Sequence, residues 1–179
     1  EYWNCAIKTD GTLWSWGAGQ NGRPLGQNQG SFLGESSPKQ VGTDTTWAKM
    51  HTNSTNGMQM YAIKTDNTMW VWGQNYRGLL GLNQTDNLQL SSPTQLPGTN
   101  WNAVSSGGYN QAVMATKSDG TLWAWGDNAH SQCGQNMTTS GFSSPVQVGS
   151  GTDWTQGRGD RAFATGGDCS VAVKTDGTL

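Results

Sequence analysis

The chain of 179 residues has a formal net charge of −2, and only 12% of its residues are charged. This weak charge gives no electrostatic reason to expect binding to nucleic acid or to a membrane surface. No apolar run approaches the roughly 18 residues of a membrane-spanning helix. Ten tryptophans supply a large apolar content, so the chain should fold despite being polar and poor in charge.

The first predicted element is a β-hairpin. Residues 6–9 (AIKT) and 12–17 (TLWSWG) have the pattern of two short strands. The Asp10-Gly11 pair between them favours a two-residue type I′ turn, in which both central residues need φ > 0. This turn would set the register of the hairpin.

The second strand of the hairpin should have two unequal faces. Trp14 and Trp16 lie two positions apart and should point to one face, while Leu13 and Ser15 point to the other. A single hairpin could not bury two tryptophans. The pattern therefore predicts sheets that pack on neighbouring sheets, large side chains against small ones.

Further along the chain, the same unit continues with a bend and two more strands. In the second copy the bend covers residues 73–83, a short edge strand entered through a proline covers 91–96, and another strand covers 101–108. This gives about four short strands in roughly 55 residues, the composition of one β-propeller blade.

The unit repeats, and its markers keep their order and phase. The tryptophan pairs recur at spacings of 56 and 53 residues. The markers are the pairs Trp14/Trp16, Trp70/Trp72 and Trp123/Trp125, the turn residues Asp10-Gly11, Asp66-Asn67 and Asp119-Gly120, the Ser-Ser-Pro triplets at 36–38, 91–93 and 143–145, and the lone tryptophans Trp47, Trp101 and Trp154. We predict a structural role for the turn residues and the tryptophan pairs. The predicted units of this partial propeller cover residues 6–61, 62–114, 115–171 and a truncated 172–179.

This order of motifs resembles the regulator of chromosome condensation repeat in its bacterial and viral form. The resemblance covers nearly the whole chain. It implies an all-β fold, a β-propeller with about three four-stranded blades and the start of a fourth, within a ring that usually has seven. The family often has a histidine five residues before the lysine of the turn motif. Those places hold Trp3, Gln59, Ala112 and Cys169 here, so a function that depends on that histidine is not expected.

Three and a fraction units cannot close a ring of seven, and the sequence stops inside a predicted hairpin. An open sheet edge is a feature that folded proteins avoid. We therefore expect the remaining blades of a longer chain, or neighbouring subunits, to complete the array.

The sequence shows no constellation of catalytic or metal-binding residues. His51 and His130 occur at unmatched phases of their units, and nothing near either marks a nucleophile. Cys133 follows His130 by three residues, but two ligands at loop spacing do not make a metal site. We predict a protein that is not an enzyme and has no cofactor and no metal. An Arg-Gly-Asp tripeptide at 158–160 is too short to predict cell adhesion.

The bends differ most between units and are the candidate partner surfaces, because binding residues on rigid scaffolds concentrate in loops. The bends cover Ala18–Glu35, Gln74–Leu90 and Asp127–Gly141. Tryptophans could also stack on sugars, but their strand positions favour the core. The candidate binding residues are Tyr76, Arg77 and Trp3.

We predict a non-catalytic binding or structural propeller that contacts a protein or glycan partner through loops on a propeller face. The charge-poor, Asn-, Gln-, Gly- and Thr-rich composition suggests a virion protein, such as a phage tail or capsid appendage, or an extracellular surface protein. Two alternatives stay open. One is a guanine-nucleotide exchange factor acting on a small GTPase, as the eukaryotic namesake implies. The other is a secreted inhibitor of an enzyme, since a related propeller type binds β-lactamases.

Overall fold

The computed structural model describes residues 3–18, 24–29, 34–52, 58–84, 87–107, 112–155, 163–165 and 169–179. Over these ranges the chain forms antiparallel β-strands and one short 3-10 turn, η1 (Tyr76–Gly78). The predicted all-β fold is therefore confirmed. No helix among these described residues is long and apolar enough to cross a membrane. The Arg-Gly-Asp tripeptide lies outside the described residues.

The described strands group into four sheets that follow one another in chain order. The first sheet contains β1 (Trp3–Ile7), β2 (Leu13–Gly17) and β3 (Glu35–Gln40). The second contains β4 (Trp47–Thr52), β5 (Gln59–Lys64), β6 (Met69–Asn75) and β7 (Leu88–Gln95). The third contains β8 (Trp101–Ser106), β9 (Ala112–Lys117), β10 (Leu122–Gly126) and β11 (Phe142–Gln147). The last contains β12 (Phe163–Thr165) and β13 (Ser170–Ala172).

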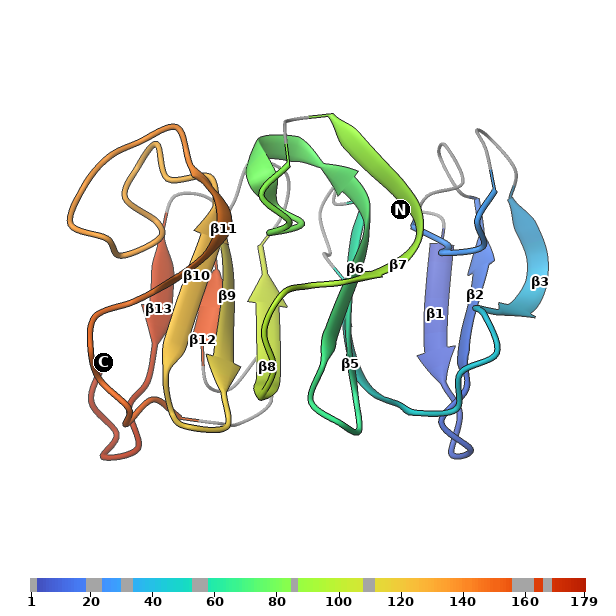
Figure 1. Ribbon diagram of the computed structural model, residues 1–179, viewed down its shortest axis with the longest axis horizontal. Coiled ribbons are helices and arrows are strands. Elements are labelled where there is room, and N and C mark those ends of the chain that lie inside the picture. Colours follow the sequence, from blue (N-terminus) through green and yellow to red (C-terminus); the bar gives the residue numbers. More distant parts are fainter. Residues whose placement is uncertain are drawn as a thin grey trace.

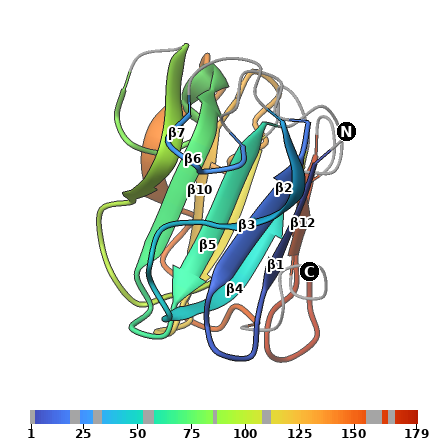
Figure 2. The same ribbon diagram turned by 90° about the vertical axis from the view of Figure 1, so that its right-hand side faces the viewer.

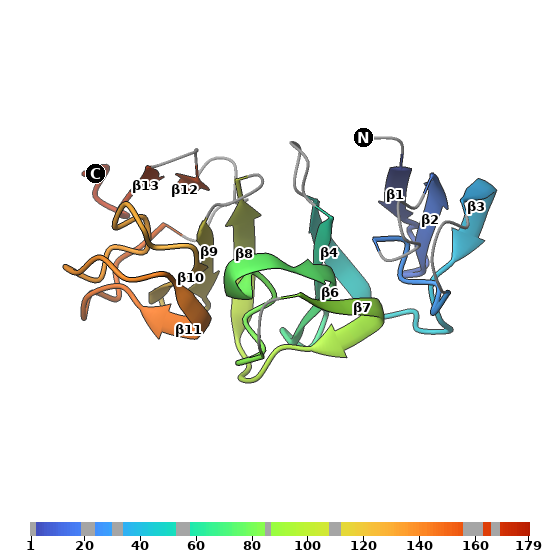
Figure 3. The ribbon, with the colours of Figure 1, turned by 90° about the horizontal axis from the view of Figure 1, so that it is seen from above.

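The sheets stand side by side as consecutive blades (Figure 1). In the side view, strands of successive sheets lie one behind another (Figure 2). Seen from above, β4 and β8 line one side of the array, and β7 and β11 line the opposite side (Figure 3). The two complete sheets contain the four antiparallel strands per unit that the repeat predicts. The unit limits chosen from the sequence and the ring of seven stay predictions.

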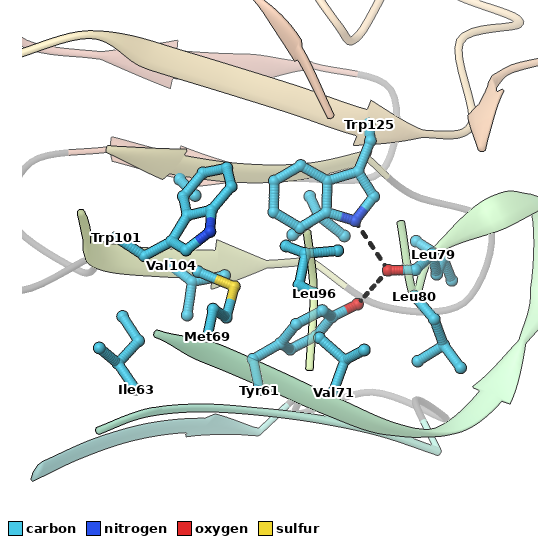
Figure 4. Close-up of a cluster of buried hydrophobic side chains, with 12 residues drawn as sticks. Tyr61, Ile63, Met69, Val71, Leu79, Leu80, Leu96, Trp101, Val104 and Trp125 are labelled. Carbon is cyan, nitrogen blue, oxygen red and sulfur yellow. Dashed lines mark hydrogen bonds between the residues drawn. The ribbon is translucent and has the colours of Figure 1, made fainter. Parts of the chain in front are cut away.

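At the first and second junctions, the tryptophan-bearing face of one sheet is buried against smaller side chains of the sheet before it. At the first junction, Trp72 of the second sheet shares a buried cluster with Leu13 and Val41 of the first. At the second, Trp125 of the third sheet packs with Val71 and residues of the same face (Figure 4). The unequal strand faces expected from the sequence thus explain how the sheets stack.

The hairpin turn differs from the expected two-residue type I′ turn, and that prediction was wrong. The amide of Gly11 donates to the carbonyl oxygen of Lys8 (2.9 Å), and the amide of Lys8 donates to that of Thr12 (2.9 Å). Of the two residues Asp10 and Gly11, only Gly11 has a positive φ, at 79°. The turn therefore has three residues, a right-handed bend followed by a left-handed bulge residue. Asp10 stays right-handed while its side chain accepts the Thr12 amide (3.0 Å).

The left-handed residue of each turn also holds the next sheet. The Trp47 amide donates to the carbonyl oxygen of Gly11, and those of Trp101 and Trp154 donate to Asn67 and Gly120, at 3.0–3.2 Å. The linker between sheets therefore lies directly on the turn, and at Gly11 and Gly120 it leaves no room for a side chain.

Candidate functional site at the junctions between the sheets

The first tryptophan of each pair ends a short hydrogen-bond chain that starts at the turn aspartate. In the second unit, the indole N–H of Trp70 donates to Thr68 Oγ1 (3.0 Å), and this hydroxyl donates to Asp66 Oδ1 (2.7 Å). The Thr68 amide donates to the same oxygen (3.0 Å). The same bonds link Asp10 to Trp14 in the first unit and Asp119 to Trp123 in the third.

These hydrogen bonds lower the pKa of the turn aspartates below its ordinary value. The main cause at Asp10, Asp66 and Asp119 is the threonine hydroxyl that donates to the carboxylate, followed by the threonine amide. Both donors favour the ionised carboxylate. The aspartates are thus explained by local structure, as predicted, because their carboxylates orient the indole that follows.

A lysine of the same motif lies between two tryptophan rings. The Nζ of Lys64 lies 4.0 Å from the ring centre of Trp70 and 4.8 Å from that of Trp47, and 2.8 Å from Asp44 Oδ2. The third unit repeats the two ring contacts at 4.2 and 4.7 Å from Lys117 Nζ. Cation–π attraction to a partly buried ammonium thus helps to fix the lone tryptophan.

In the second and third units, the second tryptophan of the pair lies deeper and bonds to the bend of the preceding unit. The indole N–H of Trp72 donates to the Pro24 carbonyl oxygen (2.9 Å), and that of Trp125 donates to the Leu79 carbonyl oxygen (2.9 Å). Tyr61 donates to the same Leu79 oxygen (2.8 Å; Figure 4). In the first sheet, Trp16 is half-buried.

The predicted binding residues lie partly inside this framework. Arg77 has φ 49° and forms an ion pair with Asp127 of the third sheet (2.7 Å), while its guanidinium lies 5.6 Å from the ring centre of Tyr76. Tyr76 packs against the core between the second and third sheets, and Trp3 against the core between the first and second. A structural role is therefore present at all three positions, and their binding role stays a prediction.

The two histidines take no part in a metal cluster among the described residues. His51 lies on β4 and accepts the amide of Ser106 on β8 through Nε2 (2.9 Å), so it links the second sheet to the third. The His130 amide donates to Gln132 Oε1 (2.8 Å). Burial raises the pKa of the Cys133 thiol to about 12, which keeps it protonated and inert at neutral pH.

The bends are braced from inside by buried asparagines. Asn75 accepts the Leu80 amide through Oδ1 (3.0 Å), and Asn128 accepts the Cys133 amide in the same way (2.9 Å). In the third bend, residues 136–140 are exposed, and Met137 is 52% exposed. The second and third bends lie at one end of the array, opposite the hairpin turns (Figure 1). The structure thus presents exposed loop tips on a rigid base.

A cavity of about 320 Å³ lies at the first junction, between the bend of the first sheet and the strands of the second. Its lining includes Trp47, Trp70, Asp44, Asn28 and Ser92. Neither this cavity nor the lysine contacts were expected from the sequence. The lysines had a signal, since Lys-Thr/Ser-Asp repeats before each tryptophan pair, but the cavity depends on how the sheets approach one another.

Comparison with known proteins supports the resemblance inferred from the motifs. Residues 66–114 match the sequence pattern of the regulator of chromosome condensation (RCC1) repeat. The chain is 30% identical to human Protein RCC2 over 88 residues, which is 48% of this chain and 16% of that protein. It is 29% identical over 118 residues to the X-linked retinitis pigmentosa GTPase regulator homolog of Caenorhabditis elegans, covering 65% of this chain and 8% of that protein. The chain therefore spans about a sixth or less of these relatives.

Solved structures share the fold over 98% of this chain. The crystal structure of human WBSCR16 has a TM-score of 0.76 at 18% identity, with 43% of that chain covered. The structure of Kap60 bound to yeast RCC1 (Prp20) has a TM-score of 0.75 at 18% identity, with 40% covered. The structure of Prp20p from Saccharomyces cerevisiae, described with its binding to Gsp1p and histones, has a TM-score of 0.73 at 16% identity, with 42% covered. The predicted propeller fold is confirmed.

Proposed function

From the confirmed presence of the regulator of chromosome condensation repeat, we propose that this chain is a protein-binding part of a propeller, without catalysis of its own, and that its partner contacts the bends. The carrying observation is the contrast within the third bend. A buried asparagine braces its base, whereas residues 136–140 at its tip are exposed. A braced loop loses little conformational entropy on binding, which favours affinity.

The exposed side chains of this bend fit a protein partner of modest polarity. Residues 136–140 are Asn, Met, Thr, Thr and Ser, with no charge among them. Met137 offers an adaptable apolar side chain at the tip, and methionine is frequent at protein interfaces. A location outside the cell or on a virion is supported by the charge-poor composition alone.

A second candidate is regulation of a small GTPase, as in a guanine-nucleotide exchange factor. It is favoured by the relatives, one of which is named as a homologue of a GTPase regulator and another of which is described with its binding to Gsp1p. These matches cover only part of those proteins, so binding of the same partners by this chain is a hypothesis. In this second candidate the same bends bind the partner, and the bound GTPase also releases its nucleotide faster.

The test places a photo-crosslinking amino acid at Met137, on the end that carries the bends, and at the exposed Thr65 in a hairpin turn at the opposite end. Purified Gsp1p and histones serve as defined probes. A lysate of the organism that makes the protein serves to find an unknown partner. We expect crosslinks from Met137 and none from Thr65, and weaker binding when residues 136–140 are replaced by glycine and serine. Equal crosslinking from both ends would contradict the proposal. Faster release of labelled GDP from Gsp1p would favour the second candidate.

A further inference from the structure

The cavity at the first junction combines an aromatic wall with polar groups. Trp47 and Trp70 line it from the second sheet, and Asn28, Asp44 and Ser92 bring an amide, a carboxylate and a hydroxyl to the same space. Small-molecule sites usually have an apolar lining and a few convergent polar groups, and a volume of about 320 Å³ is at the lower end of their range. The space therefore suits a compact ligand with apolar faces and polar edges.

One donor in this lining has no acceptor. Trp47 is only 4% exposed, and its indole N–H is buried without a hydrogen-bond partner. The indole N–H of Trp70 is already satisfied by Thr68. An unpaired buried donor costs free energy, about 1–3 kcal/mol. The indole N–H groups of Trp101 and Trp154 are buried without a partner in the same way, so this donor is a property of the repeat.

The linker before Trp47 is longer than the linker before Trp101 and as long as the linker before Trp154. Four residues separate Gly42 from Trp47, whereas two separate Gly98 from Trp101. The longer linker carries Asp44, whose side chain is 54% exposed and pairs with Lys64 through Oδ2. A Cβ built on Gly42 would meet nothing within 4 Å, so the linker leaves open space here.

We propose that this cavity binds a single neutral sugar residue, such as the terminal hexose or N-acetylhexosamine of a glycan. The apolar face of the ring packs against Trp70, and one ring hydroxyl donates to Asp44. A pyranose has alternate hydroxyl donors and acceptors around a face of C–H groups, which matches this lining. No charge is needed on the ligand, because Asp44 is already paired with Lys64.

This site is separate from the bend that carries the proposed protein contact, so either can fail alone. Proteins also use tryptophan-lined grooves to bind proline-rich peptides. The amide, hydroxyl and carboxylate beside the rings favour a ligand with many hydroxyls instead. A proline-rich peptide is therefore the competing outcome of the experiment.

The experiment titrates nitrogen-labelled protein with methyl glycosides of glucose, galactose, mannose, N-acetylglucosamine and N-acetylgalactosamine, and separately with a proline-rich peptide. The indole N–H resonances are followed by NMR, with those of Trp47 and Trp70 assigned from phenylalanine variants. We expect at least one glycoside to saturate with a Kd of about 1 mM, since few atoms can make contact in so small a site. The Trp47 and Trp70 resonances should shift most.

Two variants test the location of the site, each with a matched control in a repeat outside the cavity. Asp44→Ala should weaken glycoside binding about tenfold through loss of a charged acceptor. Its control is Asp153→Ala, because Asp153 is the equivalent aspartate of the third repeat and pairs with Lys174 Nζ (3.1 Å). This control variant should leave glycoside binding unchanged. Ser92→Phe should fill the cavity and abolish binding, whereas Ser144→Phe, at the same Ser-Ser-Pro position of the third sheet, should not.

Three results would overturn the inference. These are no shift with any glycoside up to a concentration well above the expected Kd, equal weakening by each variant and its control, and saturable binding of the proline-rich peptide alone. Unfolding temperatures of the variants show that a loss of binding is not a loss of fold.

Discussion

Replacing Gly120 with alanine tests how closely the inter-sheet linker lies on the hairpin turn. Gly120 has φ 83°, and a Cβ built there would lie 1.9 Å from the carbonyl oxygen of Thr152. A carbon and a carbonyl oxygen normally approach to about 3.3 Å. The linker would therefore have to move away, although the Trp154 amide holds it to the Gly120 carbonyl oxygen at 3.2 Å.

The expected loss in free energy of unfolding has two parts. A left-handed conformation costs a residue with a Cβ about 1 kcal/mol, and forcing extra atoms into a packed site costs about 1–3 kcal/mol. The sum is about 2–4 kcal/mol. At about 2–4 °C per kcal/mol for a domain of this size, Gly120→Ala should lower Tm by roughly 10 °C.

The assay is differential scanning calorimetry of Gly120→Ala beside Gly149→Ala. Gly149 has nearly the same kind of backbone, with φ 61°, but a Cβ built there would meet nothing within 4 Å. Only the conformational cost applies to it, about 1 kcal/mol or a few degrees of Tm. If both variants lower Tm equally, the linker does not pack on the turn as closely as the structure shows.

Three further predictions follow from the charges and thiols. Asp119→Asn should destabilise the protein above pH 3.8, the ordinary pKa of this carboxyl. The difference from wild type should shrink as pH falls from that value through the lowered folded pKa, because the stability from a lowered pKa is lost as the folded carboxylate is protonated. Urea unfolding at several pH values checks this, and a pH-independent difference would contradict it. Arg77→Met should lower the free energy of unfolding by about 1–2 kcal/mol, because it leaves the buried carboxylate of Asp127 without its cation. The double variant Arg77→Met/Asp127→Asn should recover part of this loss in the same unfolding assay. No recovery would refute the pairing. Native protein should react quickly with a thiol reagent at the exposed Cys169 and slowly at the buried Cys133, which peptide mapping checks; equal rates would show that Cys133 is not protected.

Some features needed only local pattern and could be predicted from the sequence. The hairpin strands, the faces of Trp14 and Trp16, and the four strands per unit follow from alternation and from the repeat, which depend on residues close together in the chain. The turn was the exception. Asp10-Gly11 correctly predicted the place of the turn, but the predicted turn type was wrong. The aspartate side chain accepts the Thr12 amide and keeps Asp10 right-handed.

The sequence by itself therefore determined the fold class and the repeated scaffold. The repeat length and the alternation along each strand indicate which residues share a face. Only the tertiary structure decided what lies between the sheets. The ion pair of Arg77 with Asp127 joins residues 50 positions apart, and the cavity beside Asp44 is lined by residues of the first bend, the linker and the second sheet. Such contacts depend on how closely two sheets approach, and the residue pattern within one strand does not predict that distance.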